Sequence, residues 1–165
     1  HPLSTECRRA IAPFAELERS PEHIHTYRLT IWDSGTRALL ATTPGVGAYT
    51  AVALACRVGR VERFPRSHSL ANYWGLTPGC RDSGETRRPG SITKAGSATA
   101  RWLLAQMTRQ VLRKDARLRE WFKRIKRRRG SSIARVAVMR KLATTIWHML
   151  TKKKTYAECR ALSAS

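Results

Sequence analysis

The chain has 165 residues, of which 42% are hydrophobic, and a formal net charge of +21 at pH 7. This length is sufficient for one domain with a proper hydrophobic core. No apolar run approaches the roughly 20 residues of a membrane-spanning helix, and no basic N-terminal segment precedes an apolar one, so we expect no membrane partner and no signal peptide. The four cysteines and five histidines are scattered without zinc-ligand spacing, so we expect reduced thiols and no metal site.

The positive charge is unevenly distributed along the chain. Residues 1–56 contain five basic and five acidic side chains, which cancel. The other 27 of the 32 Lys and Arg residues, against six of the 11 acidic residues, all follow residue 56. This asymmetry predicts a polyanion-binding surface in the last two-thirds of the chain, and nucleic acid is the expected polyanion.

The hydrophobic periodicity predicts an all-α domain that follows a helical arm. The arm comprises two imperfect helices within residues 1–38, the second beginning at Ser20-Pro21 and continuing to about Leu40. Strand signals are weak throughout. Further helices are expected from Thr50 to Cys56, near residues 70–74, after the Gly96-Ser97 cap, over residues 115–129, and from the Ser131-Ser132 cap to about residue 150.

The hydrophobic pattern also predicts where the core lies. Residues 133–150 are almost continuously apolar, so this segment is the best candidate for a central core helix. Five large side chains are expected in the core rather than in contact with bases: Phe64, Leu70, Tyr73, Trp74 and Leu76. Residues 157–165 are expected to form a polar tail.

The turn Pro44-Gly45-Val46-Gly47 has the composition of an anion seat. Glycine frees the backbone to point N–H groups outward, and the helix that follows adds its positive N-terminus. The pattern is similar to a helix-hairpin-helix element, in which Gly45, Val46 and Gly47 would hold a nucleic-acid backbone. An ordinary glycine-rich turn between helices is the alternative.

A polar loop centred on Asp82-Ser83-Gly84 is expected between residues 75 and 96. Arginine offers paired planar donors for phosphate oxygens, so this loop is suited to gripping a phosphodiester. Five basic residues would supply the donors: Arg81, Arg87, Arg88, Lys94 and Arg101. From the residues alone, a turn residue that bonds its own backbone is the favoured interpretation of Ser83.

A second basic region lies in the helix expected over residues 115–129. Six of the seven residues from Lys123 to Arg129 are basic. We expect Lys123, Arg124, Arg127 and Arg128 to contact a nucleic-acid backbone. A solvated helix face is the alternative interpretation of the same run.

Several motifs occur in an order that resembles one known family. They are PGVGAYTA, RF, LANYWGLTP, SG, GSITKAGSATARWLL and ARVAVMRKLATTIWHML. Together they resemble the C-terminal transposase domain of the one-ten family of bacterial insertion sequences, whose relatives include the pilin-gene invertases. The resemblance covers residues 39–156, with residues 1–38 matching only the end of the coiled-coil region that precedes this domain.

The resemblance implies a reaction for the serine loop. The Ser-Gly motif of the family, matched here by Ser83-Gly84, attacks a DNA phosphodiester and forms a covalent phosphoserine link. A resolvase-like domain supplies Mg²⁺ through four carboxylates. Nothing in this chain matches them, and Asp82 and Glu85 are too few for a dependable metal site. The chain is therefore expected to be the serine-bearing half of a two-domain enzyme, inactive alone.

The resemblance also implies partners and a location. These are DNA, a structured guide RNA, and other copies of the full-length protein in a dimer or tetramer, in the bacterial cytoplasm near the nucleoid. A different class of function is a non-catalytic nucleic-acid-binding module or a decayed remnant of a transposase. A basic ribosomal or RNA-chaperone protein would explain the charge but not the ordered motifs.

Overall fold

The computed structural model describes residues 34–83 and 86–162, with the backbone alone for Ser34, residues 80–83 and 86–90, and Leu162. Most of the predicted arm, up to residue 33, lies outside the described residues, as do Gly84 and Glu85. The described elements are α3 (Ser34–Ala41), α4 (Ala48–Val58), the 3₁₀ turn η2 (Val61–Arg63), α5 (Ser67–Tyr73), β1 (Pro78–Ser83), β2 (Thr86–Ile92), α6 (Ala98–Lys114), α7 (Ala116–Arg129), α8 (Ser131–Lys152) and α9 (Tyr156–Leu162).

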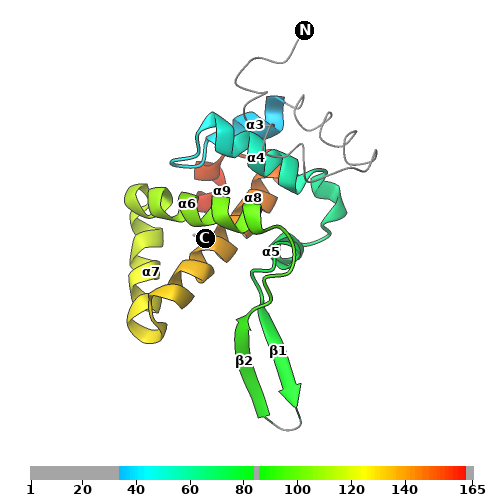
Figure 1. Ribbon diagram of the computed structural model, residues 1–165. Coiled ribbons are helices and arrows are strands. Elements are labelled where there is room, and N and C mark those ends of the chain that lie inside the picture. Colours follow the sequence, from blue (N-terminus) through cyan, green and yellow to red (C-terminus); the bar gives the residue numbers. More distant parts are fainter. Residues whose placement is uncertain (1–33, 84–85, 163–165) are drawn as a thin grey trace.

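A helical body and a projecting β-hairpin make up the described part of the chain (Figure 1). The predicted all-α class is confirmed, because the sheet has only two strands. Helix α8 passes through the body and contacts α3, α5, α6, α7 and α9. Its buried residues include Val138, Leu142, Ile146 and Met149, which recur at helical spacing. The prediction of a central core helix is therefore confirmed.

The prediction of an irregular loop between residues 75 and 96 was wrong. Strands β1 and β2 pair in antiparallel register there, with Ser83 opposite Thr86 and Arg81 opposite Arg88. The register shifts between Pro78 and Cys80, where Gly79 lies. Glycine and proline within the strands hide the usual alternation of apolar and polar residues, which is why the sequence did not reveal the hairpin.

Two helix starts follow local capping chemistry, the predicted cap at Ser97 and a further one at Asp115. The Ser97 hydroxyl accepts a hydrogen bond from the Ala100 N–H over 3.2 Å, and the Asp115 carboxylate accepts one from the Leu118 N–H over 2.9 Å. The predicted cap at Ser131-Ser132 was wrong. Gly130 is the N-cap of α8 with a φ of 86°, so both serines belong to the first turn of the helix.

Two further details differ from expectation. Phe64, Leu70, Trp74 and Leu76 are buried as predicted, but Tyr73 is 46% exposed at the end of α5. The Arg63 guanidinium lies 4.5 Å from the centroid of the Tyr73 ring, which accounts for an aromatic side chain at the surface. Residues 157–162, expected as a tail, belong to α9, and Tyr156 and Cys159 of that helix are buried.

Candidate nucleic-acid interface

Ser83 is the last residue of β1 in a hairpin that projects from the helical body (Figure 1). Its pairing with Thr86 leaves two residues to connect the strands. Next along the ladder, Asp82 stands opposite Arg87 and Arg81 opposite Arg88. The backbone thus brings three of the predicted phosphate-binding arginines within a few residues of Ser83.

The base of this hairpin is tightly fixed to the body by two glycines. Gly75 and Gly96 both have positive φ, 66° and 83°. A Cβ at Gly75 would collide with the Ala95 carbonyl oxygen, and a Cβ at Gly96 would collide with the Tyr73 carbonyl oxygen. Only residues without a side chain fit this close approach of two backbone segments.

Arg101 joins the same segments through its guanidinium group. Its Nη1 donates hydrogen bonds to the carbonyl oxygens of Trp74 (3.2 Å), Ala95 (3.3 Å) and Gly96 (3.1 Å). The sequence predicted Arg101 as a ligand of the nucleic-acid backbone, and that contact stays a prediction; in the structure its guanidinium bonds the hairpin base. Lys94, also predicted, lies in the same region with an exposed side chain and a φ of 54°.

The turn before α4 contains the three residues predicted to seat a phosphate. Gly45 has a φ of 81°, and a Cβ there would overlap the side chain of Gln110 on α6. Val46 is 8% exposed and belongs to the core. Gly47 is exposed and is the N-cap of α4, and a Cβ added to it would meet no other atom within 4 Å. Of the three, Gly47 is the residue with open space in front of the helix terminus.

The α4 N-terminus has the physical features of an anion seat. Its N-cap residue, Gly47, has no side chain to cap it. The N–H groups of a first helical turn have no partner inside their own helix and carry the positive end of the helix dipole. Whether α3, the turn and α4 act as a helix-hairpin-helix element stays a prediction.

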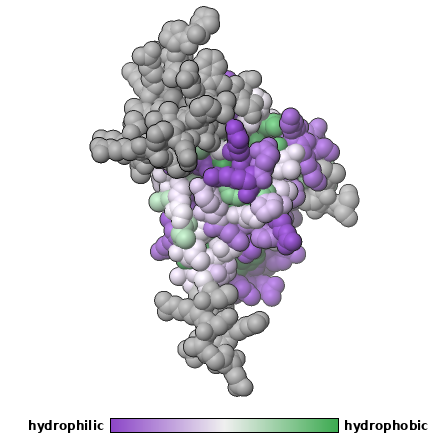
Figure 2. Space-filling view, turned by 90° about the vertical axis from the view of Figure 1, so that its right-hand side faces the viewer, coloured by the Kyte–Doolittle hydropathy of each residue, from purple (hydrophilic) through white to green (hydrophobic). Residues whose placement is uncertain are grey.

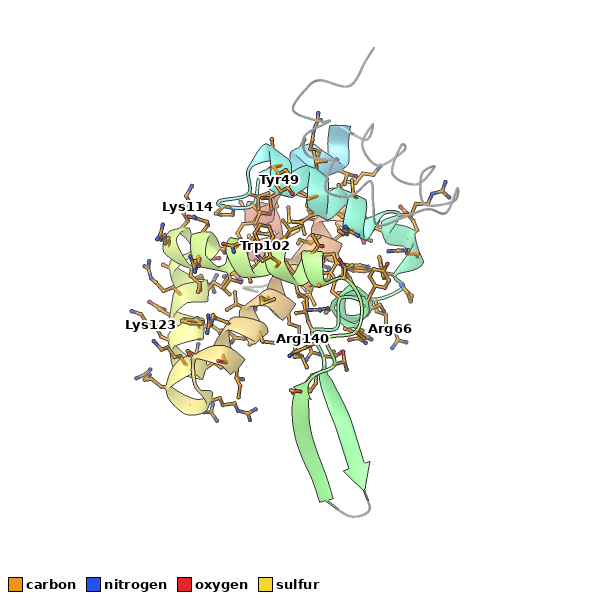
Figure 3. All side chains as sticks on the ribbon, viewed as in Figure 1. Tyr49, Arg66, Trp102, Lys114, Lys123 and Arg140 are labelled. Atoms are coloured by element: carbon orange, nitrogen blue, oxygen red, sulfur yellow. The ribbon has the colours of Figure 1, made fainter. Side chains whose placement is uncertain are left out.

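The basic helix α7 presents its predicted residues to solvent. Lys123, Arg124, Arg127 and Arg128 are all exposed. The apolar side of α7 packs on α8, with Leu118 buried and Trp121 and Phe122 partly buried. Further exposed basic residues on the neighbouring helices were not predicted as contacts: Arg109, Arg113 and Lys114 on α6, and Arg135 and Arg140 on α8 (Figure 3).

A second exposed basic group was also missed from the sequence. Arg60, Arg63 and Arg66 are exposed around η2 and the start of α5. They recur every three residues, which is the period of a 3₁₀ turn and was the signal available in the sequence. Figure 2 views the molecule from this side and shows hydrophilic side chains over much of the described surface.

Asp115 is one of the few acidic residues and is not part of the exposed surface charge. It accepts hydrogen bonds from the Tyr156 hydroxyl (3.0 Å) and from Nε of Arg160 (2.9 Å) in addition to the Leu118 N–H. Burial raises the pKa of its carboxyl, but these hydrogen bonds and the Arg160 charge outweigh burial, and the pKa is lowered overall. Burial and the Asp115 charge raise the pKa of Tyr156.

Residues 34–83 and 86–162 contain neither a cluster of metal ligands nor a helix fit to span a membrane. No group of three or more His, Cys, Asp or Glu residues in these ranges could hold a metal ion. None of the helices described there is both long and apolar enough to cross a membrane. The candidate site of this part of the chain is therefore cationic and free of a preformed carboxylate cluster.

The family model for "Transposase IS116/IS110/IS902 family" matches residues 37–123, and the chain belongs to this family. It is 37% identical over 117 residues to the transposase for insertion sequence element IS1111A of Coxiella burnetii, covering 68% of this chain and 32% of that protein. It is 31% identical over 160 residues to a probable family 20 transposase of Pseudomonas aeruginosa, covering 93% of this chain and 45% of that protein.

A shorter similarity concerns a different class of protein. Over 37 residues, the chain is 65% identical to a DNA 3'-5' helicase XPB of Kineococcus radiotolerans, which covers 21% of this chain and 7% of the helicase. The chain therefore spans less than half of the length of the two transposases named above.

Proposed function

We propose that this chain is the serine-bearing part of a DNA transposase and that Ser83 is its nucleophile. The position of Ser83 carries the proposal. It ends a strand at the far end of a projecting hairpin, and the body behind that hairpin is strongly basic. A hairpin of this shape can insert a hydroxyl group beside a phosphodiester while the helices hold the flanking DNA.

The proposed step is a transesterification at phosphorus. The Ser83 oxygen forms a bond to the phosphorus atom, and the bond from phosphorus to one deoxyribose oxygen breaks. The serine proton is given up to a base, and the departing oxygen takes up a proton. One phosphoester bond replaces another, so the link can be reversed to join a new DNA end.

Negative charge on the phosphate must be balanced during this step. The proposed partners of the phosphate oxygens are Arg81, Arg87 and Arg88. These residues lie within two register positions of Ser83 in the pairing of β1 with β2. Lys94 adds a further cation near the hairpin base. The exposed residues of α7, together with Gly47 at the α4 N-terminus, are proposed to hold the DNA backbone.

The proposal includes partners outside this chain. Mg²⁺ prefers several oxygen ligands, and the described residues offer no group of three such side chains, so no step through a metal is derived for this chain. We propose that the longer transposase supplies the carboxylate ligands of Mg²⁺. It would also bind a structured guide RNA and assemble with other copies into a dimer or tetramer.

A single substitution in the complete transposase tests the nucleophile. Ser83→Ala removes one hydroxyl, so we expect strand exchange to be lost while DNA affinity changes by less than about twofold. Ser91→Ala on β2 of the same hairpin is the matched control and should retain exchange. A covalent adduct trapped with wild-type protein should map by mass spectrometry to the peptide that contains Ser83. Strand exchange at a near wild-type rate in Ser83→Ala would exclude this assignment.

An experiment on residues 1–165 alone distinguishes catalysis from DNA binding. We expect them to bind duplex DNA but not to cleave or join it with Mg²⁺ present, because a poorly nucleophilic hydroxyl needs activation. Nicking by residues 1–165 that depends on Ser83 would contradict this expectation. If the complete protein also forms no covalent adduct with DNA, the chain is a non-catalytic nucleic-acid-binding module.

A further inference from the structure

Two aromatic side chains on neighbouring helices are exposed without a partner among the described residues. Trp102 on α6 is 55% exposed, and Tyr49 on α4 is 43% exposed. Neither makes a hydrogen bond or a ring contact within residues 34–83 and 86–162. Exposed Tyr and Trp side chains that gather on one surface are enriched at binding interfaces.

The other tryptophans in the described part of the chain are buried or partly buried. Trp74 is fully buried, and the indole N–H of Trp147 donates to the Phe64 carbonyl oxygen over 2.8 Å. Trp121 packs against the core, with the Lys141 ammonium 5.4 Å from its ring centroid. Trp102 is therefore the tryptophan in these ranges whose flat face is open to a ligand.

Tyr49 and Trp102 lie on two neighbouring helices. Helices α4 and α6 contact each other, and Gly45 in the turn before α4 lies against Gln110 of α6. Figure 3 shows Tyr49 on α4 above Trp102 on α6. Along α6, exposed residues continue from Trp102 at the spacing of one helix face: Gln106, Arg109 and Arg113.

The charge on this surface selects an anionic ligand. Neither α4 nor α6 contains an acidic residue. Arg109, Arg113 and Lys114 are exposed on the C-terminal half of α6, beyond Trp102. An anion that also has flat apolar faces fits such a surface, and a strand of unpaired nucleotides has both properties. Bases within a duplex are stacked on one another and offer no face to Trp102.

We propose that the surface formed by Tyr49, Trp102, Gln106, Arg109, Arg113 and Lys114 binds unpaired nucleotides. Bases stack on Trp102 and Tyr49, and the phosphates follow the basic half of α6. This site is separate from the hairpin, and it requires no reaction at Ser83. It gives the chain a preference for single strands, which backbone contacts from α7 do not supply.

The test measures how purified residues 1–165 bind fluorescent oligo-dT, oligo-U and a duplex of mixed sequence at several salt concentrations. We expect Trp102→Ala to weaken binding to unpaired strands by about 5- to 100-fold, the loss of one stacked base. Affinity for the duplex should stay within about twofold. The slope of log affinity against log salt should not change, because no cation is removed. Oligo-dT and oligo-U distinguish single-stranded DNA from RNA as the ligand.

Two control variants separate stacking from other effects. Trp102→Phe keeps an aromatic face and should recover most of the lost affinity. Ile133→Ala on α8 removes a side chain that is 52% exposed but not aromatic, and should have no effect. The proposal would be overturned if Trp102→Ala lost as much affinity for the duplex as for single strands. It would also be overturned if this variant lost no affinity for oligo-dT or for oligo-U. A Trp102→Phe variant as weak as Trp102→Ala would do the same.

Discussion

Gly45 and Gly47 lie two residues apart in the turn before α4, and the structure gives them different roles. Gly45 has a positive φ and lies against Gln110, so its lack of a side chain is a packing requirement. Gly47 has a φ of −81° and a ψ of 172°, which any residue adopts, and open space around it. A glycine at position 47 is therefore not needed for folding.

The first prediction follows from this contrast. Gly47→Val should fold with a loss of less than about 1 kcal/mol, since only a glycine cap is exchanged. It should weaken DNA binding, because a branched side chain would stand in front of the α4 N–H groups. Gly45→Ala should lose about 2 kcal/mol or more through strain and collision with Gln110. Urea unfolding and fluorescence anisotropy measure both effects, and unchanged DNA affinity in a folded Gly47→Val would return this turn to a purely structural role.

The second prediction concerns Asp115. Its pKa in the folded protein is lowered from a reference value of 3.8. A lowered pKa means that the stabilisation by this carboxylate is complete above about pH 5 and is lost as pH falls through 3.8 toward the folded-state pKa. Asp115→Asn should be less stable at pH 7 and should lose less stability than wild type between pH 5 and pH 3. Unfolding curves at these pH values measure the difference. An identical pH dependence in the two proteins would show that Asp115 is not responsible.

At the scale of one element, the β-hairpin depends on contacts made at its base. Arg101 bonds three carbonyl oxygens there, and Thr93 and Lys94 donate their N–H groups to the carbonyl oxygens of Thr77 and Gly75 over 3.0 and 3.2 Å. The strands contact each other far more than they contact the helices. Their direction relative to the body is thus set mainly by this small group of bonds.

The third prediction is that Arg101→Gln loosens the hairpin. Hydrogen exchange of the β1 and β2 amides should accelerate, exchange in α8 should change less, and the free energy of unfolding should fall by about 1–3 kcal/mol. Arg109→Gln, an exposed change on the same helix, is the matched control and should do neither. If Arg101 binds a phosphate instead, its loss should reduce the salt slope of DNA binding by about 1 and leave hydrogen exchange unchanged.

At the scale of the whole molecule, the surface charge is spread over several helices rather than gathered in one base-reading set. Exposed Lys and Arg residues lie on α6, α7 and α8 and around η2. Asp115 is paired with Arg160, and α7 itself carries one acidic residue, Glu120, against eight Lys and Arg residues. Contacts of this kind hold phosphates and release counterions without reading sequence.

The fourth prediction is a steep salt dependence. Affinity of residues 1–165 for unrelated duplexes should fall with a log–log slope of about −5 or steeper, corresponding to six or more phosphates. Replacing Lys123, Arg124, Arg127 and Arg128 together by Gln should make the slope shallower by roughly 3. Binding isotherms at increasing salt give these slopes. A wild-type slope equivalent to one or two contacts would contradict nucleic acid as the main partner.

The helices were largely predictable because their signals are local. Ser97 and Asp115 cap helices through bonds to residues three positions along, and the apolar spacing of α8 is present in the sequence itself. The family was predictable for a related reason, since the order of its motifs is a property of the sequence. The identity of Ser83 as a candidate came from that order and not from geometry.

What the sequence by itself determined is therefore the all-α class, the main helices, the asymmetry of charge and the family. Only the tertiary structure decided which residues meet across the chain. In it, the Arg101 guanidinium bonds the carbonyl oxygen of Trp74, 27 positions away, and Asp115 pairs with Arg160, 45 positions away. The tertiary structure also placed the Arg63 guanidinium against the Tyr73 ring, whereas Trp102 is exposed without a ring contact among the described residues. The physical reason is that capping and periodicity act within one or two helical turns, whereas burial and pairing depend on which distant segments the core brings together.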